Sequence, residues 1–311
     1  MKDTKHKILT LAALTTIAAG VIHLTNRVIV ASSQLKEMLD FSNHNYYNWR
    51  FGKIYYTKKG KGSPLLLIHD TMPGASGYEW SRVEDQLAQE HTVYTLDLLG
   101  CGRSEKAGIT YTNFLFVQII CDFIKNVIKE KTDIIASGFS CSFVTTAAAY
   151  DKESINKIMF INPVSMISLA QTTTKKDKLF KFFIELPIFG TFIYHIIVSR
   201  ETINDFFLDK LYYNPFHVDK DVLDAYYEAA HKGGYYAKCL YSSQSAKYMN
   251  INIRHAVESI DNSIYIVEGE DEPNGAAIVE AYQKVNPAIE SATIPCSKHF
   301  RHIENVEAFL E

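Results

Sequence analysis

Short apolar runs alternate with segments of helical period along most of this chain. The runs predict strands at 49–56, 65–68, 92–96, 133–136, 158–161, 264–267 and 292–294. Helical period recurs between them, at 83–90, 114–128, 143–150 and 276–284. Continuous apolar runs bounded by turn residues are typical of strands buried on both faces of a parallel sheet. We therefore predict an α/β fold, a mostly parallel sheet with helices on both faces.

Residues 166–262 interrupt this alternation and are mainly helical by pattern. They lie between two predicted strands, so we predict a helical cap inserted between two parts of one core, 43–165 and 263–311. The chain has 19 Tyr and 18 Phe but only 2 Trp, and many of these rings fall in the cap. They include Phe180, Phe182, Phe183, Phe189, Phe192 and Tyr194. Those rings that face the pocket would favour a lipophilic small-molecule substrate.

The N-terminal apolar stretch stands apart from the core pattern. Three lysines lie within the first seven residues, residues 8–26 contain no charged side chain, and Arg27 follows. As a helix this stretch is about 28 Å long, nearly a bilayer core. We predict that residues 1–42 are a hydrophobic anchor helix and linker, with the lipid bilayer as the partner of residues 8–26. A soluble helix packed on the domain is the alternative.

Charge and cysteine content exclude several functions and leave the location open. The net charge of −3 offers no broad basic surface for nucleic acid. The five cysteines form no C-x-x-C pair, so we expect no structural zinc, and we expect no other metal or cofactor. The lysines before the apolar stretch favour a domain outside the cytoplasm. An odd number of cysteines suits a reducing compartment better, so a cytoplasmic domain is the alternative.

A glycine- and serine-rich turn follows the predicted strand at 133–136. Residues 138–142 have the sequence G-F-S-C-S, of the form G-x-S-x-S, and lead into a predicted helix. Such a turn is typical of a nucleophile elbow, which pushes the Ser140 hydroxyl out above the sheet. Gly138 lets the chain approach itself closely. The helix N-terminus would offer the N–H of Cys141. The alternative is an ordinary strand–helix turn.

Further motifs follow in the order that such chemistry uses. H-D-T-M-P-G at 69–74 follows the first buried strand, and D-L-L-G-C-G-R-S at 97–104 follows the second. E-G-E-D-E-P at 268–273 and K-H-F-R-H-I-E at 298–304 follow the last two strands. Serine, acid, histidine is the chain order of the α/β-hydrolase triad. Over about 49–311 the sequence resembles the α/β-hydrolase superfamily, in the capped branch of esterases, carbon–carbon bond hydrolases, epoxide hydrolases and pheophytinase-like enzymes.

The resemblance implies roles for individual residues. Ser140 matches the nucleophile and His299 the general base. Glu272 falls on the acid position of G-x-x-D-P, and Asp271 is its rival. Some relatives take the acid from the loop after the fourth strand instead, but this chain has no carboxylate between Glu153 and Asp177.

The same resemblance implies an oxyanion hole and shows two departures. The donors would be the N–H of Cys141 and that of Thr71 or Met72. Asp70 replaces the glycine of H-G, and its carboxylate would oppose a developing negative charge unless it points away. Ser142 replaces the second glycine of the elbow. Either change marks a tuned substrate range or a scaffold that has lost activity.

These motifs predict a serine hydrolase that cleaves an ester-type bond through an acyl-enzyme. An acyltransferase using the same triad, or a non-catalytic binding protein on the same scaffold, is the alternative. A serine nucleophile argues against haloalkane dehalogenase and epoxide hydrolase chemistry, because those relatives carry a carboxylate at the elbow.

Overall fold

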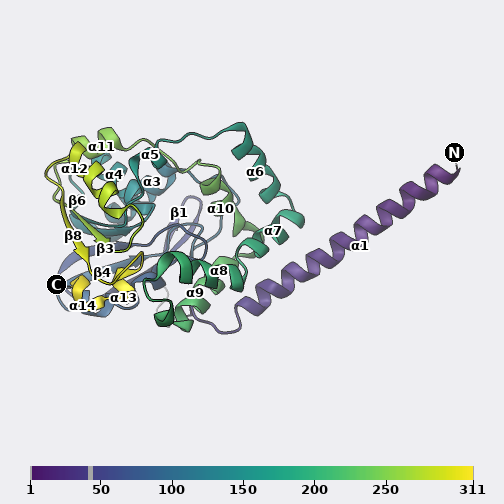
Figure 1. Ribbon diagram of the computed structural model, residues 1–311, viewed down its shortest axis with the longest axis horizontal. Helices are drawn as coiled ribbons and strands as arrows, with labels where there is room; N and C mark the ends of the chain where they lie inside the picture. Colours follow the sequence, from purple (N-terminus) through teal and green to yellow (C-terminus); the bar gives the residue numbers. More distant parts are fainter. Residues whose placement is uncertain (1, 41–44, 311) are drawn as a thin grey trace.

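The protein is described from a computed structural model that covers residues 2–40 and 45–310 (Figure 1). The described residues form an eight-stranded sheet in the order β1-β2-β4-β3-β5-β6-β7-β8. Its strands are β1 Asn45–Trp49, β2 Gly52–Lys59, β3 Ser63–Ile68, β4 His91–Leu96, β5 Thr132–Ser137, β6 Ile155–Ile161, β7 Ile264–Gly269 and β8 Glu290–Ile294. Strands β3 to β8 are parallel, and β1 and β2 pair antiparallel at one edge. The predicted α/β class is confirmed.

Alternate residues of the central strands pack on opposite faces of the sheet. Leu66 and Ile68 of β3 join the larger core, against the helices on one face. Leu65 and Leu67 join a smaller core, with Trp80, on the other face. The core helices are α2 Glu84–Leu87, α3 Asn113–Phe123, α4 Ser140–Tyr150, α11 Arg254–Ser259, α12 Gly275–Val285, α13 Arg301–Glu304 and α14 Val306–Leu310. This two-sided burial explains why the strands are apolar at successive positions.

Three elements differ from the predicted bounds. The strand predicted at 49–56 is divided by a hairpin, because β1 ends at Trp49, the chain turns at Arg50 and Phe51, and β2 begins at Gly52, which has a φ of +149°. The helix predicted at 83–90 is shortened to the four residues of α2, since the chain turns at Ala88 to enter β4. The helix predicted at 114–128 is α helical only to Phe123, and a π-helical turn, Ile124–Ile128, completes it.

The insertion between β6 and β7 is mainly helical, as its pattern predicts. The α-helices of this cap are α5 Met166–Leu169, α6 Lys175–Glu185, α7 Phe189–Ile197, α8 Arg200–Phe206, α9 Lys220–His231 and α10 Lys238–Ser245. Rings of this cap form a cluster that reaches the core at Phe300. Its aromatic members are Tyr194, Phe207, Tyr212, Tyr226 and Phe300. Phe300 is the neighbour of His299, so this aromatic cluster lies beside the predicted catalytic base.

Helix α1, Lys2–Ser33, projects away from the body of the molecule (Figure 1). It packs on α7 and α9 only toward its C-terminal end, where the Asn26 side chain donates a 3.0 Å hydrogen bond to the carbonyl of Ile188. Its segment His6–Ser33 is long and apolar enough to cross a membrane. By length and composition it fits either a membrane anchor or a signal sequence.

Candidate active site

The turn between β5 and α4 has its tip at Gly138, not at Ser140. Gly138 has a φ of +55°, in the left-handed region that favours glycine. Phe139 follows with helical backbone angles, and Ser140 is already the first residue of α4. In a nucleophile elbow, the nucleophile stands on the strained residue between strand and helix. The structure therefore has a glycine where the resembling enzymes carry their nucleophile.

Ser140 lies behind this tip and is sealed from solvent. Its side chain is fully buried, and its Oγ donates a 2.6 Å hydrogen bond to the carbonyl oxygen of His69. Within residues 2–40 and 45–310, no hydrogen bond or ion pair joins Ser140 to His299. The expected pairing of these two residues is not formed, because α4 begins three residues before the predicted helix and carries Ser140 into the helix.

The carboxylate of Asp70 occupies the place that a side chain at the tip would take. A Cβ atom on Gly138 would come within 2.6 Å of Asp70 Oδ1, and closer still to Cγ and Oδ2. Oδ1 accepts hydrogen bonds from the N–H of Phe139 at 2.8 Å and of Thr71 at 2.6 Å. These are the residue after the tip and a residue of the loop after β3, the two sources of an oxyanion hole. Asp70 thus places one carboxylate oxygen in that hole.

Two buried side chains hold the backbone of Asp70. His69 accepts the N–H of Leu98 on Nε2 at 3.0 Å, so its proton is on Nδ1, which donates to the carbonyl of Asp70. Burial lowers the pKa of His69 and keeps it neutral. Glu79 accepts the N–H of Asp70 at 3.2 Å and the hydroxyl of Ser137. Burial raises the pKa of Glu79 to about 7. Both contacts fix the loop that aims Asp70.

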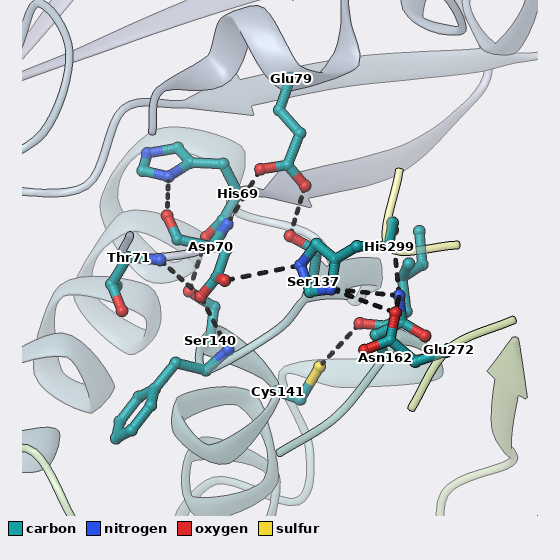
Figure 2. A network of polar contacts seen from close by, with 12 residues as sticks. His69, Asp70, Thr71, Glu79, Ser137, Ser140, Cys141, Asn162, Glu272 and His299 are labelled. Atoms are coloured by element: carbon teal, nitrogen blue, oxygen red, sulfur yellow. Dashed lines mark hydrogen bonds and ion pairs between the residues drawn. The ribbon is translucent and has the colours of Figure 1, made fainter. Parts of the chain in front are cut away.

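His299, after β8, faces two acids (Figure 2). Its Nε2 lies 3.8 Å from Asp70 Oδ2, and its Nδ1 lies 3.6 Å from Glu272 Oε2. Burial opposes the imidazolium, but the Asp70 and Glu272 carboxylates outweigh burial and raise the pKa of His299 to about 9. At neutral pH the site is therefore a row of carboxylate, imidazolium and carboxylate.

The remaining predicted residues take other positions. Asp271 is exposed, and its N–H donates to the carbonyl of Ser297, so the acid beside His299 is Glu272. The thiol of Cys141 donates to the carbonyl of Ala136 at 3.3 Å. Met72 packs against the cap cluster. The N–H groups that face the carboxylate at the tip are those of Phe139 and Thr71, so of the predicted donors only Thr71 is in place.

Asn162 is a site residue that the sequence analysis did not single out. It follows β6, and its amide donates to the carbonyl oxygen of His299 at 3.0 Å and to Glu272 Oε2 at 3.4 Å. This is the loop from which some relatives take their acid. A carboxylate is the group expected at this place, whereas the amide of Asn162 orients both the acid and the base. No group of three or more His, Cys, Asp or Glu within the described ranges is arranged to hold a metal ion.

The raised pKa of His299 makes folding stability depend on pH. Because its pKa in the fold, about 9, exceeds the ordinary 6.5, its contribution is complete below pH 6.5 and is lost as the pH rises through 9. The free energy of unfolding that His299→Gln removes should be smaller at high pH than at pH 6, by about 3 kcal/mol. Urea unfolding of the native protein and the variant at pH 6 and above pH 9 measures this difference. His255→Gln, at an exposed position, is the control, and an equal loss at both pH values for His299→Gln would contradict the assignment.

Comparisons with known proteins place the chain among hydrolases. It is 28% identical over 114 residues, 36% of this chain, to the 2-hydroxy-6-oxo-6-(2'-aminophenyl)hexa-2,4-dienoic acid hydrolase of Metapseudomonas resinovorans. It is 29% identical over 109 residues, 35% of this chain, to a soluble epoxide hydrolase of Corynebacterium sp. (strain C12). The matched stretches cover 39% and 37% of those two relatives, well under two thirds of their length.

Similarity in structure extends over more of the chain. The fold is similar to that of a serine hydrolase involved in carbazole degradation, CarC, with a TM-score of 0.69, at 19% identity and over 86% of this chain and 95% of that one. The model of the Alpha/beta hydrolase family matches residues 65–311, which include the tip at Gly138 and the Asp70, His299 and Glu272 side chains. This chain belongs to the alpha/beta hydrolase family.

Proposed function

We propose that this protein is a hydrolase whose nucleophile is the Asp70 carboxylate, with His299 and Glu272 as the pair that activates water. One observation carries the proposal: Asp70 fills the space at the elbow tip, with Oδ1 held by two N–H groups and Oδ2 facing His299. The geometry supports this chemistry in place of ester cleavage or acyl transfer by Ser140, whose hydroxyl is fully buried and bonded to a backbone carbonyl.

In the first step, Oδ2 of Asp70 attacks a saturated carbon of the substrate. A carbon–oxygen bond forms, and the bond from that carbon to its leaving group breaks, with the electron pair going to the leaving group. The product is an ester between Asp70 and the substrate, formed by nucleophilic catalysis. A carboxylate suits this reaction better than attack on a carbonyl, because a carbonyl substrate would give a reactive anhydride.

In the second step, water attacks Cγ of the Asp70 ester. His299, which becomes neutral once the charge of Asp70 is lost in the ester, accepts the proton of this water on Nε2, and Glu272 stabilises the imidazolium through Nδ1. Negative charge develops on Oδ1, which already accepts two backbone N–H groups, and loss of one such donor costs about 3 kcal/mol. Collapse breaks the bond between Cγ and the alkyl oxygen, and His299 gives its proton to the alcohol. The resulting carboxylic acid of Asp70 then passes its proton to His299, which restores the resting carboxylate and imidazolium.

The leaving group needs a proton donor, and Tyr226 of the cap is the candidate. Its side chain is fully buried, and its hydroxyl has no hydrogen-bond partner within the described part of the chain. Burial, followed by the Glu79 and Asp70 carboxylates, raises the pKa of Tyr226 well above its ordinary value, so the hydroxyl keeps its proton. A neutral phenol within the electrostatic range of the Asp70 carboxylate can donate a hydrogen bond to a departing halide, or a proton to a departing oxygen that solvent then replaces.

The cap cluster around Phe300 supports a lipophilic substrate. The relative from Corynebacterium is by name an epoxide hydrolase, and an epoxide is a saturated carbon whose leaving group is a ring oxygen. Apolar epoxides and haloalkanes are therefore the substrates to test first, with medium-chain esters as the comparison. A cavity of about 20 Å³ between Thr71 and the cap residue Tyr194 holds no more than one water, so an organic substrate needs other space or a displaced cap.

We also propose that α1 anchors the protein in a lipid bilayer. Its apolar side chains are exposed over most of its length, for example 71% of Leu9, 64% of Ile17 and 61% of Val21. Exposed apolar surface of this extent is costly in water and stable in hydrocarbon. The packing of α1 on α7 and α9 holds the cap next to that bilayer.

A single turnover in 18O-labelled water tests the nucleophile. With enzyme in excess over substrate, the attacking water leaves its oxygen in the Asp70 carboxylate, and the alcohol carries the former Oδ2. Mass spectrometry of the peptide that contains Asp70 should show one heavy oxygen. The same peptide from the His299→Gln variant should instead retain the mass of the bound substrate. Label in the released product alone would contradict an Asp70 ester, and no reaction with any of the three substrate classes would favour a non-catalytic binding scaffold.

A further inference from the structure

Helices α6 and α7 of the cap expose apolar side chains that a soluble cap would bury. On α6 only Lys181 and Ile184 are buried, and Lys181 pairs with Glu185 beneath the helix. The outward side chains of the two helices are Leu179, Phe182, Phe183, Phe189, Ile193 and Ile196, each between 41% and 59% exposed. We call these six residues the apolar cap face. A surface helix normally shows the opposite arrangement, with its apolar stripe turned inward.

The corner between these helices lies against the end of the apolar stretch of α1. Ile188, between α6 and α7, accepts the hydrogen bond from Asn26, and Asn26 is the last residue of the uncharged stretch 8–26. Figure 1 shows α6 and α7 on the side of the body from which α1 projects. If residues 8–26 cross the bilayer, the level of its surface therefore passes through the corner of the apolar cap face.

The dimensions and charges of the face suit the surface of a bilayer. Helix α6 has 11 residues and α7 has 9, which is too short for either to span. The two axes, with α7 continued to Leu211, are bent by 103°, so they do not form one straight span. Lys175, Lys176 and Lys178 are exposed in the first turns of α6, where they can reach lipid phosphates while Phe182 enters the acyl region. This is the pattern of an interfacial helix.

We propose that the apolar cap face docks on the same bilayer in which α1 is anchored. This inference goes beyond the chemistry of Asp70 and rests on the proposed anchor. The partner is a phospholipid surface with anionic headgroups, because exposed aromatic rings and lysines lie together on α6. Docking would cover six apolar side chains and hold the cap at the level where lipophilic molecules leave the membrane.

Tryptophan reporters in the full-length chain test the docking. Phe182→Trp places a reporter on the apolar cap face, and Phe114→Trp is the control, because Phe114 lies on core helix α3 and is equally exposed, at 59%. Each variant is reconstituted in vesicles of phosphatidylcholine and phosphatidylglycerol, with or without bromine on the upper acyl carbons. Both native tryptophans, Trp49 and Trp80, are buried in the body, and their emission is the same background in both variants.

Brominated lipid should reduce the emission of the Phe182→Trp reporter at least twofold, and should leave the Phe114→Trp reporter unchanged. Flotation of the vesicles separates the two ideas that are tested. A protein that does not float with the vesicles would contradict the anchor and, with it, the docking. A protein that floats while Phe182→Trp is not quenched would contradict the docking alone. If that unquenched emission also shifts to the blue with protein concentration, a second copy of the chain covers the face instead.

Discussion

The variant Asp70→Asn should lose turnover by about 10⁴-fold or more, whereas Ser140→Ala should stay within a few fold of the native rate. An amide has nearly the shape of the carboxylate, but it lacks the charge and the free electron pair that attack carbon. No hydrogen bond or ion pair joins Ser140 to His299 within the described residues, and the Ser140 hydroxyl donates to the backbone carbonyl of His69. The turnover rates of the two variants therefore show which residue is the nucleophile. Steady-state kinetics on an apolar epoxide or haloalkane measure these rates.

Stability has to be followed in both variants. Ser140→Ala removes a buried hydrogen bond and should cost about 1 kcal/mol, which thermal unfolding by circular dichroism detects. Asp70→Asn should remain folded, because its side-chain oxygen can still accept the N–H groups of Phe139 and Thr71. A folded Ser140→Ala that has lost the activity, together with an active Asp70→Asn, would restore the serine as the nucleophile.

The double variant Asp70→Gly/Gly138→Ser should acquire a reactive serine. Removal of the carboxylate empties the space at the tip and frees the N–H groups of Phe139 and Thr71 for an oxyanion. A side chain at position 138 then stands on the strained residue of the elbow. There it faces His299, whose Nε2 now lies near Oδ2 of Asp70. Fluorophosphonate should label the double variant quickly and at position 138.

Single variants are the controls for this gain of reactivity. Gly138→Ser alone forces its Cβ into the Asp70 carboxylate, so it should be destabilised and unreactive. Asp70→Gly alone should fold but present no nucleophile, and the native protein should not be labelled at Ser140. Fast labelling of the native protein, lost in Ser140→Ala, would show that the serine is activated and would refute the placement of the tip at Gly138.

Most of the fold could be predicted because its signals are local. The buried strands are apolar at successive positions, since Leu65 and Leu67 pack on one face of the sheet and Leu66 and Ile68 on the other. The cap follows from the loss of alternation after β6. What periodicity could not predict was the hairpin of β1 and β2, where the chain reverses between Trp49 and Gly52. An apolar and aromatic run continues across such a turn without a change of period.

The site was only partly predictable, for a geometric reason. His299 and Glu272 follow strands whose order brings them together, so motif and topology agree. The elbow is different, because G-F-S-C-S fits the nucleophile pattern by its letters in one register, while the backbone adopts another. The register depends on where β5 ends and on the approach of Asp70, a side chain 68 positions before Gly138 in the sequence. The sequence shows that an aspartate stands at position 70, where glycine is usual, but it does not show in which direction the Asp70 side chain points.

The row of charges at His299 implies a timed release of protons. In the resting site two carboxylates sustain the imidazolium, with a pKa of about 9. Conversion of Asp70 to an ester removes one of these charges, so the pKa of His299 must fall at the moment when the ring has to accept a proton from water. The chemistry of the first step would thus prepare the base for the second. With a haloalkane, whose halide departs without a proton, a pH indicator in weakly buffered solution should then record a burst of protons, up to one per active site, before any alcohol is released.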